Sequence, residues 1–111
     1  MVVAIDSVLE DNAALLAAGD VAGLVARYAP DAQIVHATGV ARGSEEIEAL
    51  FRDQSRHRPQ AVAVELVGRS EDTVAYRARM RVDGTEVGLV GSMVLRGGLI
   101  WRQTTVVVEQ P

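Results

Sequence analysis

Hydrophobic residues in the first part of the chain repeat with the period of an α-helix. Apolar positions between residues 2 and 18 recur at helical spacing, and Gly19 is a typical residue to end such a helix. Asp20 can cap a second helix over residues 21–28, and Pro30 would stop it. The pattern therefore predicts two consecutive helices joined at the Gly19-Asp20 step.

A short strand and a third helix are predicted next. The segment 31–37, "DAQIVHA", has the composition of a strand. Ser44 is the expected N-cap of a helix that continues to about Gln54, with acidic residues in its first turn. This helix must end before Pro59, since the residue before a proline is disfavoured in the helical conformation.

The second half of the chain has the period of β-strands. Four strand-like runs lie at residues 61–67, 73–82, 86–96 and 99–109. Asp83-Gly84 and Gly97-Gly98 are hairpin turn signals between the last three runs. Three helices followed by a meander of strands predict one α+β domain over residues 1–111, with the helices packed on one face of a curved antiparallel sheet.

Alternation along these strands predicts which side chains face the helices. In the run 73–82 the apolar residues alternate with arginines, which indicates one buried and one solvated face. Carried across the hairpins, the pattern predicts a mostly apolar small-molecule pocket with a few fixed polar groups. The substrate-binding residues expected from the three strands are Tyr76, Met80, Met93, Trp101, Gln103 and Thr105.

Two small residues in the predicted inward faces, Ala78 and Gly91, allow two interpretations. They either leave space for a ligand or relieve crowding where the sheet bends. On the opposite face four valines are unusual for a solvated sheet, and we expect them to form a homodimer interface. These are Val90, Val94, Val106 and Val108.

Composition excludes several kinds of chemistry. The sequence has no cysteine and no lysine, so thiolate and lysine Schiff-base catalysis are excluded. Its net charge of −4 argues against nucleic-acid or anionic-membrane partners.

The start of the chain lacks a basic region typical of a signal peptide, and no apolar run is long enough to span a membrane, so we expect a cytoplasmic protein. The two histidines are far apart in sequence, which gives a metal site little support; His57, between Arg56 and Arg58, is expected in a solvated basic loop.

Residues 15–51, "LLAAGDVAGLVARYAPDAQIVHATGVARGSEEIEALF", resemble the SnoaL-like and ketosteroid-isomerase-like branch of the nuclear transport factor 2-like superfamily. The resemblance rests on the A-G-D step, the Y-A-x-D-A segment and the R-G-x-E-x-I start of the third helix. It implies a cone-shaped, cystatin-like α+β barrel with a pocket between the helices and the concave face of the sheet.

The same resemblance implies roles for particular positions. Ketosteroid isomerases have their carboxylate general base at the position of His36 and a tyrosine oxyanion donor at the position of Asn12. Their second donor, a protonated aspartate, corresponds to Gly91. The base is therefore replaced by a histidine, and most of the oxyanion hole for steroid isomerisation is missing.

Each candidate also has a structural interpretation. His36 can act as a general acid/base near neutral pH, or it is a structural histidine bonded to a backbone carbonyl. Asn12 lies at the border of the buried stripe of the first helix. It can donate a hydrogen bond to a substrate oxyanion, or it is a structural asparagine whose hydrogen bonds are made within the protein. Tyr28 ends the second helix in this scheme, and its hydroxyl points into the pocket or into the core.

The sequence supports two classes of function. The first is a cofactor-independent enzyme of isomerase, cyclase or dehydratase type that acts on a hydrophobic carbonyl compound, such as a polyketide-, terpenoid- or steroid-like molecule, with His36 and Asn12 as catalytic residues. The second is a non-catalytic ligand-binding or dimerisation module of the same fold. An epoxide hydrolase-like enzyme has less support, because its Asp-Arg-Asp arrangement is missing from the predicted inward faces.

Overall fold

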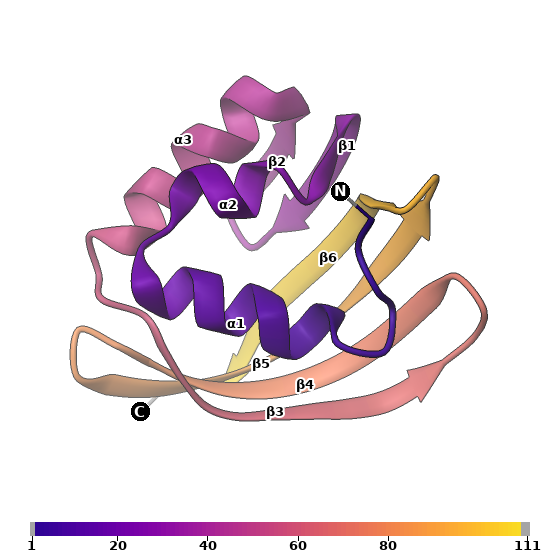
Figure 1. The fold of residues 1–111 in the computed structure, drawn as a ribbon. Helices are drawn as coiled ribbons and strands as arrows, with labels where there is room; N and C mark the ends of the chain where they lie inside the picture. Colours follow the sequence, from indigo (N-terminus) through magenta and orange to yellow (C-terminus); the bar gives the residue numbers. More distant parts are fainter. Residues whose placement is uncertain (1, 110–111) are drawn as a thin grey trace.

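The structure, a computed structural model, describes residues 2–109 of the chain. Within this range the chain forms three helices and six strands around one curved sheet (Figure 1). In chain order the elements are α1 (Val8–Ala18), α2 (Val21–Val25), β1 (Tyr28–His36), β2 (Gly39–Arg42), α3 (Gly43–Ser55), β3 (Gln60–Arg69), β4 (Thr73–Val82), β5 (Thr85–Arg96) and β6 (Leu99–Glu109). None of the described helices is long and apolar enough to cross a membrane.

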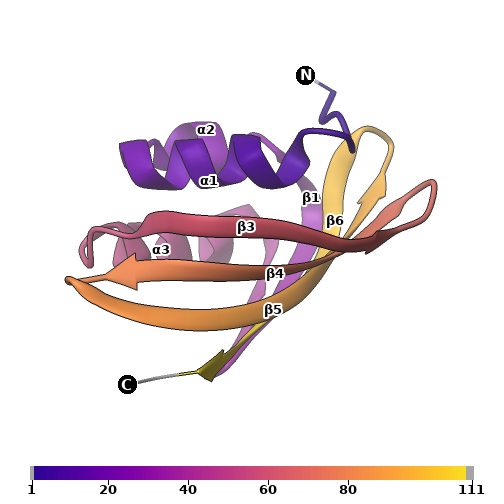
Figure 2. The same cartoon turned by 90° about the horizontal axis from the view of Figure 1, so that it is seen from below.

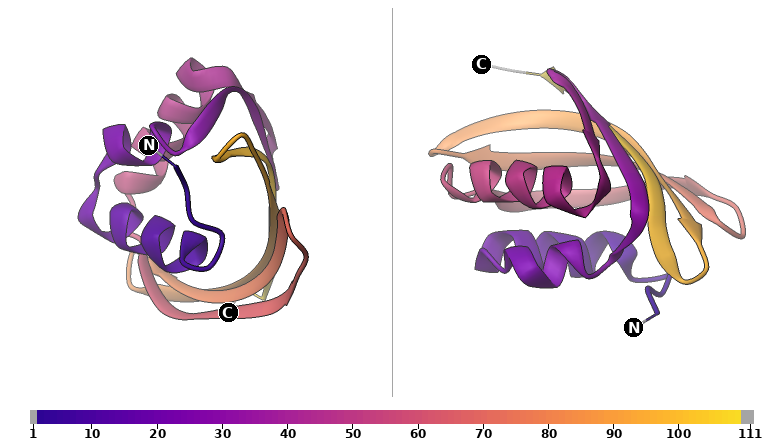
Figure 3. Two further views of the ribbon diagram at one scale, coloured as in Figure 1. Left: turned by 45° about the vertical axis from the view of Figure 1, so that its right-hand side comes forward. Right: turned by 90° about the horizontal axis from the view of Figure 1, so that it is seen from above.

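The sheet has the strand order β2-β1-β6-β5-β4-β3. Neighbouring strands are antiparallel except β1 and β6, which run parallel. The long strands β3, β4 and β5 bend together (Figure 2), and the sheet curves round the helices without closing into a barrel (Figure 3). The predicted α+β class with helices on the concave face is confirmed.

The core lies between the concave face of the sheet and the helices. Helix α3 packs against β1 and α1 packs against β3, so the two helices cover different parts of the curve. The largest fully buried side chains are Val8, Leu24, Ile34, Ile47, Val74 and Ile100.

The hairpin turns form as the sequence predicts. Asp83 and Gly84 have φ angles of 51° and 81°, and Gly97 and Gly98 have φ angles of 61° and 78°. Two consecutive residues with positive φ are typical of the tight turns whose twist matches that of a β-hairpin. The register of β4 with β5 is unbroken from Thr73 to Val82, so the inward and outward faces of β4 are as expected.

The first helix is shorter than predicted. It begins at Val8 rather than at Val2. Val3 precedes the helix, is buried, and donates its backbone N–H to the carbonyl of Gly98 at 2.6 Å. Tertiary contact with the β5–β6 turn therefore replaces the first predicted helical turn.

The second helix is also shorter, and Tyr28 does not end it. Asp20 caps α2 through a bond from the Gly23 N–H at 2.9 Å, as expected, but α2 ends at Val25 and Tyr28 begins β1. Pro30 lies inside this strand, where the pairing of β1 with β6 shifts register. A proline, which has no N–H, is tolerated in a strand where the ladder is interrupted.

The segment before the third helix differs in two ways from the expectation. Residues 39–42 form β2, a strand that the sequence pattern did not indicate, paired with β1. Helix α3 then begins at Gly43, and Ser44 is not its N-cap. The Glu46 carboxylate instead accepts the backbone N–H of Arg42 at 2.9 Å, which satisfies a donor at the start of the helix.

Gly91 makes room for a neighbouring side chain rather than for a ligand. It lies opposite Tyr76 in the β4–β5 ladder, and the Tyr76 ring covers it. A Cβ atom at position 91 would overlap the Tyr76 hydroxyl and the Thr104 carbonyl. The space left by this glycine is thus filled by a neighbouring aromatic ring, which a side chain at 91 would displace.

We predict that Gly91→Ala lowers the free energy of unfolding by about 2 kcal/mol, since overpacking a filled site forces neighbours to shift. Urea unfolding measures the change. Gly68→Ala is the matched control, because Gly68 lies in β3 with no atom within 4 Å of an added Cβ, and it should change stability by about 0.5 kcal/mol or less. Equal effects of the two substitutions would contradict this packing.

Candidate functional site

A cavity of about 350 Å³ lies between the concave face of the sheet and helices α1 and α3. Its walls are mainly apolar and include Leu16, Leu50, Ala78, Met80, Leu89 and Met93. The predicted pocket residues Asn12, Tyr28, His36, Tyr76, Gln103 and Thr105 also line it. The described lining contains no aspartate, glutamate or arginine, so the cavity suits an uncharged, largely apolar ligand.

Four polar side chains meet at the buried end of this cavity, and we call them the inner polar cluster. They are Asn12 from α1, Tyr28 from β1, Tyr76 from β4 and Gln103 from β6. The Asn12 amide donates to the Tyr28 hydroxyl at 3.2 Å, and the Tyr28 hydroxyl donates to Gln103 Oε1. The Gln103 amide then donates to the Tyr76 hydroxyl at 3.2 Å. One chain of hydrogen bonds thus joins four elements that are distant in sequence.

Both ends of this chain are fixed by groups outside the cavity lining. The Tyr76 hydroxyl donates to the backbone carbonyl of Thr104 at 3.3 Å. At the other end the guanidinium of Arg27, which is only 8% exposed, donates from Nε to Asn12 Oδ1. Because the guanidinium can only donate, it fixes the Asn12 carbonyl oxygen toward itself and the amide nitrogen toward the cavity.

Burial determines the protonation state of the two tyrosines. Loss of hydration raises the pKa of Tyr28 far above its ordinary value, and the nearby Tyr76 adds to this effect. Burial also raises the pKa of Tyr76. Both hydroxyls therefore stay neutral, and their protons are used in bonds to Gln103 and Thr104.

The two amide groups of the cluster keep unused donors. Each amide nitrogen carries two N–H groups. Among the hydrogen bonds of residues 2–109, Asn12 Nδ2 and Gln103 Nε2 each use one of them within the cluster. A second N–H on each nitrogen is therefore available to an acceptor such as a ligand oxygen.

His36 lies on the cavity wall near its outer end, where β1 gives way to the turn into β2. It is half-buried, and its Nδ1 lies 3.2 Å from the Thr38 hydroxyl. The imidazole therefore faces the cavity from a partly hydrated position rather than from the deep interior. Its Nε2 atom is the ring nitrogen that remains for a ligand.

Trp101 is the exception among the predicted pocket residues, and the expectation that it lines the cavity is wrong. The β5–β6 register places Val94 opposite Arg102 and Leu95 opposite Ile100, so Trp101 is an extra residue at a bulge. The bulge turns Ile100 into the core and directs Trp101 elsewhere.

The indole of Trp101 lies among charged groups outside the cavity. The guanidinium carbons of Arg96 and Arg102 are 4.3 Å and 3.9 Å from the centre of its ring, and its Nε1 donates to Asp31 at 3.4 Å. Cation–π contacts of this kind stabilise a surface cluster. Asp31, a residue of β1, thus contacts the first part of β6.

The structure adds one group that the sequence pattern placed elsewhere. His57, expected in a solvated basic loop, is half-exposed and also lines the cavity. Its Nδ1 lies 2.7 Å from the carboxylate of Asp83 in the β4–β5 turn. The two residues are 26 positions apart, so only the folded topology reveals the pair. Within residues 2–109 no three histidine, aspartate or glutamate side chains are grouped as metal ligands would be.

Known proteins share this architecture. The sequence matches the SnoaL-like domain family over residues 9–103, and no curated protein matches the chain. The crystal structure of a protein from Sphaerobacter thermophilus is similar with a TM-score of 0.84 at 17% identity, over 99% of this chain and 100% of that one. An NTF2-like protein of unknown function from Cytophaga hutchinsonii has a TM-score of 0.81 at 12% identity, over 97% and 93% of the two chains.

One similar structure is that of a described enzyme. SalBIII, an epoxide hydrolase/cyclase-like enzyme with a role in pyran ring formation in the polyether salinomycin, has a TM-score of 0.77 at 16% identity, over 93% of this chain and 89% of that one. At such identities these similarities show the fold alone. Together with the match over residues 9–103, they confirm the predicted SnoaL-like, NTF2-like relationship.

Proposed function

The chain belongs to the SnoaL-like domain family, and we propose that its cavity is the active site of a cofactor-independent acid/base enzyme of isomerase, cyclase or dehydratase type. The ligand is an uncharged apolar molecule with a carbonyl group, such as a polyketide-, terpenoid- or steroid-like compound. The observation that carries the proposal is the combination of amide donors at the buried end of an apolar cavity with an imidazole on its wall.

The proposed chemistry is enolisation. The ligand carbonyl oxygen accepts N–H groups of Asn12 and Gln103, while His36 Nε2 removes a proton from the carbon next to the carbonyl. The electron pair of the broken C–H bond moves to the oxygen, and the amides stabilise the resulting enolate. Returning the proton to carbon completes the cycle, so no cofactor is consumed.

The charge of the lining supports enolisation over epoxide opening. SalBIII is described as epoxide hydrolase/cyclase-like, but the described lining of this cavity has histidine, amide and hydroxyl groups and no carboxylate. A histidine base with neutral donors matches proton abstraction beside a carbonyl. The alternative function is a non-catalytic ligand-binding or dimerisation module that uses the same cavity only as a carrier site.

Deuterium uptake by 2-tetralone, a bicyclic ketone with acidic α-protons, tests the proposal without knowledge of the natural substrate. In D2O the protein should accelerate exchange at the α-carbon, and His36→Gln should reduce the acceleration by about 100-fold, the scale typical of a lost general base. Val35→Thr, on the outer face of the same strand, is the control and should leave the rate unchanged.

Two results would favour the non-catalytic alternative. One is an exchange rate no faster than that in imidazole buffer. The other is saturable binding of 2-tetralone, measured by the quenching of ligand or protein fluorescence, with no exchange at all. Equal rates in wild type and in the His36→Gln variant would remove His36 from the mechanism.

We further propose that the protein forms a homodimer through the outer, convex face of the sheet. Val90 and Val106 lie directly opposite each other in the β5–β6 ladder, and Val106 is 44% exposed. Val94 lies on the same face and Val108 is 56% exposed near the end of β6. This exposed apolar area supports burial against a second copy.

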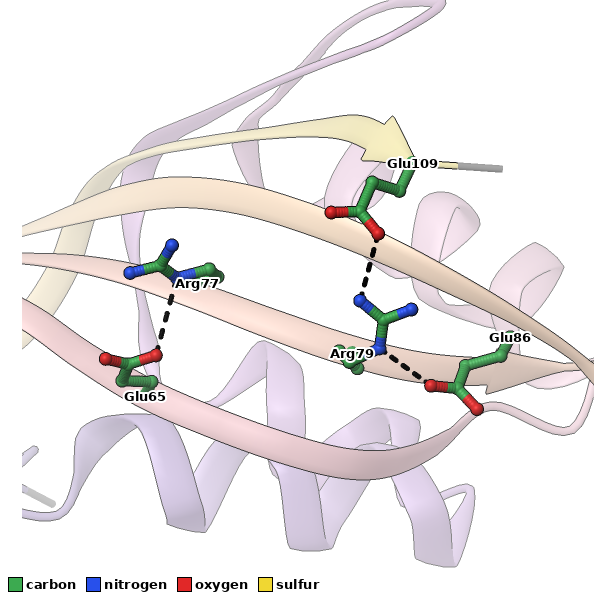
Figure 4. Close-up of polar contacts among 5 residues, drawn as sticks. All are labelled: Glu65, Arg77, Arg79, Glu86 and Glu109. Carbon is green, nitrogen blue, oxygen red and sulfur yellow. Dashed lines mark hydrogen bonds and ion pairs between the residues drawn. The ribbon is translucent and has the colours of Figure 1, made fainter. Parts of the chain in front are cut away.

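Ion pairs lie beside this apolar area. In the proposed dimer they would orient the second chain on the sheet. Arg79 contacts Glu86 at 2.7 Å and Glu109 at 3.0 Å, while Arg77 contacts Glu65 at 3.4 Å (Figure 4). Because these pairs are exposed, they add little to the stability of one chain. An apolar centre with a charged border is the usual arrangement of a protein interface.

Sedimentation tests the dimer. The wild-type protein should sediment with the mass of two chains at micromolar concentration, and Val106→Glu should give the mass of one chain, since a buried unpaired carboxylate opposes association. Val2→Glu, at a position 80% exposed and away from the sheet face, should remain dimeric. A wild-type mass of one chain would contradict the proposal.

A further inference from the structure

A second histidine, His57, lines the cavity, and the partner of its Nδ1 atom is closer than that of His36 Nδ1. His57 Nδ1 is 2.7 Å from Asp83 Oδ2, whereas the Nδ1 of His36 has only the Thr38 hydroxyl at 3.2 Å. Asp83 therefore offers His57 a charged acceptor, and His36 has a neutral partner from its own turn. His57 lies in the loop that follows α3, His36 is the last residue of β1, and both line the same cavity.

Two backbone contacts fix the His57–Asp83 pair in addition to the side-chain bond. The Asp83 N–H donates to the His57 carbonyl at 2.8 Å, and the His57 N–H donates to the Gln54 carbonyl at 3.0 Å. The first contact joins the α3–β3 loop to the β4–β5 turn at the same point as the side chains do. A pair held at both backbone and side chain keeps its geometry better than a single surface ion pair.

Unusual backbone conformations occur beside this pair. Within the described residues, Arg58 and Asp83 are the two residues other than glycine with positive φ, at 48° and 51°. The φ of Asp83 follows from its turn with Gly84. Arg58 precedes Pro59 and has no such turn chemistry, so its conformation is strained and is held by the surrounding contacts.

From this geometry we propose that His57 and Asp83 form a second proton-transfer centre at the outer end of the cavity. The proposal rests on the proposed function, since it concerns the same cavity and the same class of ligand. It adds a residue with acid/base chemistry, His57, and a positioning residue, Asp83. The ligand then has a second acidic group, a C–H beside a carbonyl or an enolic O–H, near the outer end.

The carboxylate determines which nitrogen of His57 meets the ligand. Asp83 accepts the proton-bearing Nδ1, so neutral His57 has its lone pair on Nε2. Nε2 takes a proton from the ligand's C–H or O–H group, and the electron pair of that bond stays on the ligand as an enolate. The imidazolium formed is stabilised by the Asp83 carboxylate, which stays ionised, and Nε2 returns the proton to the ligand or to water.

The first measurement needs no ligand. Nitrogen-15 NMR of the imidazoles at a pH where both histidines are neutral should show His57 mainly as the Nδ1–H tautomer. Asp83→Asn should abolish this preference, because an amide can also donate to Nδ1. Asp53→Asn, at an exposed carboxylate of α3, is the matched control and should leave the His57 tautomer unchanged. A His57 found mainly as the Nε2–H tautomer in wild type would overturn the pair.

The second measurement tests proton transfer with 2-tetralone in D2O. In the His36→Gln background the remaining exchange should fall by about tenfold or more when His57→Gln is added, and by a smaller factor with Asp83→Asn. A His36→Gln rate already equal to the rate in buffer, or one that neither further substitution changes, would overturn the proposal. Circular dichroism of each variant confirms that it is folded.

The two measurements separate this proposal from the proposed function. If wild type does not accelerate exchange, the proposed enolisation fails, while the tautomer of His57 still reports whether the pair exists. If wild type accelerates exchange and His36→Gln alone removes the acceleration, the proposed function stands and the second centre fails.

Discussion

The chain of hydrogen bonds from Arg27 through the inner polar cluster is the interaction on which the rest of this structure depends. It joins α1, β1, β4 and β6 inside an otherwise apolar core. The Arg27–Asn12 and Asn12–Tyr28 bonds are buried, so breaking either would leave a polar group without a partner at a cost of about 1–3 kcal/mol; the two bonds of Gln103 are partly buried. Helix α1 therefore cannot shift against the concave sheet without losing the bonds that Asn12 makes to Arg27 and Tyr28. Hydrophobic packing alone would permit many such shifts.

The same hydrogen bonds fix polar groups at one end of an otherwise apolar cavity. Ala78 contributes a small wall, and Tyr76 occupies the space above Gly91 while its hydroxyl completes the cluster. The tyrosine protons are used in internal bonds, so in the proposed mechanism the amides of Asn12 and Gln103 are the donors for the ligand carbonyl. Their arrangement is set by the fold, which is what stabilisation of an oxyanion requires. The two imidazoles that line the cavity supply the proposed acid/base groups.

Sequence patterns predict the sheet better than the segments around it. Strand 73–82 is recognisable from alternation because arginines occupy its outer face, and the turns are recognisable from Asp83-Gly84 and Gly97-Gly98. Trp101 was misplaced because a bulge changes the alternation of β6 without any mark in its composition. Tyr28 was assigned to a helix because local propensity hides the long-range pairing that makes it a strand residue. Strand alternation predicts Gln103 as a site residue, and the family resemblance together with the border of the buried stripe of the first helix indicates Asn12. Their connection to Arg27 and the pairing of His57 with Asp83 depend on topology that no local pattern contains.

A double-mutant cycle on Asn12 and Gln103 tests whether the inner polar cluster acts as one unit. These residues do not bond each other in the structure; the Tyr28 hydroxyl connects them. Urea unfolding of Asn12→Leu, Gln103→Leu and the double variant gives their coupling free energy. If the cluster is one unit, the double variant is less destabilised than the sum of the single variants by about 1 kcal/mol. Additivity within about 0.3 kcal/mol would contradict the claim, because it would mean that the two amides stabilise the fold independently.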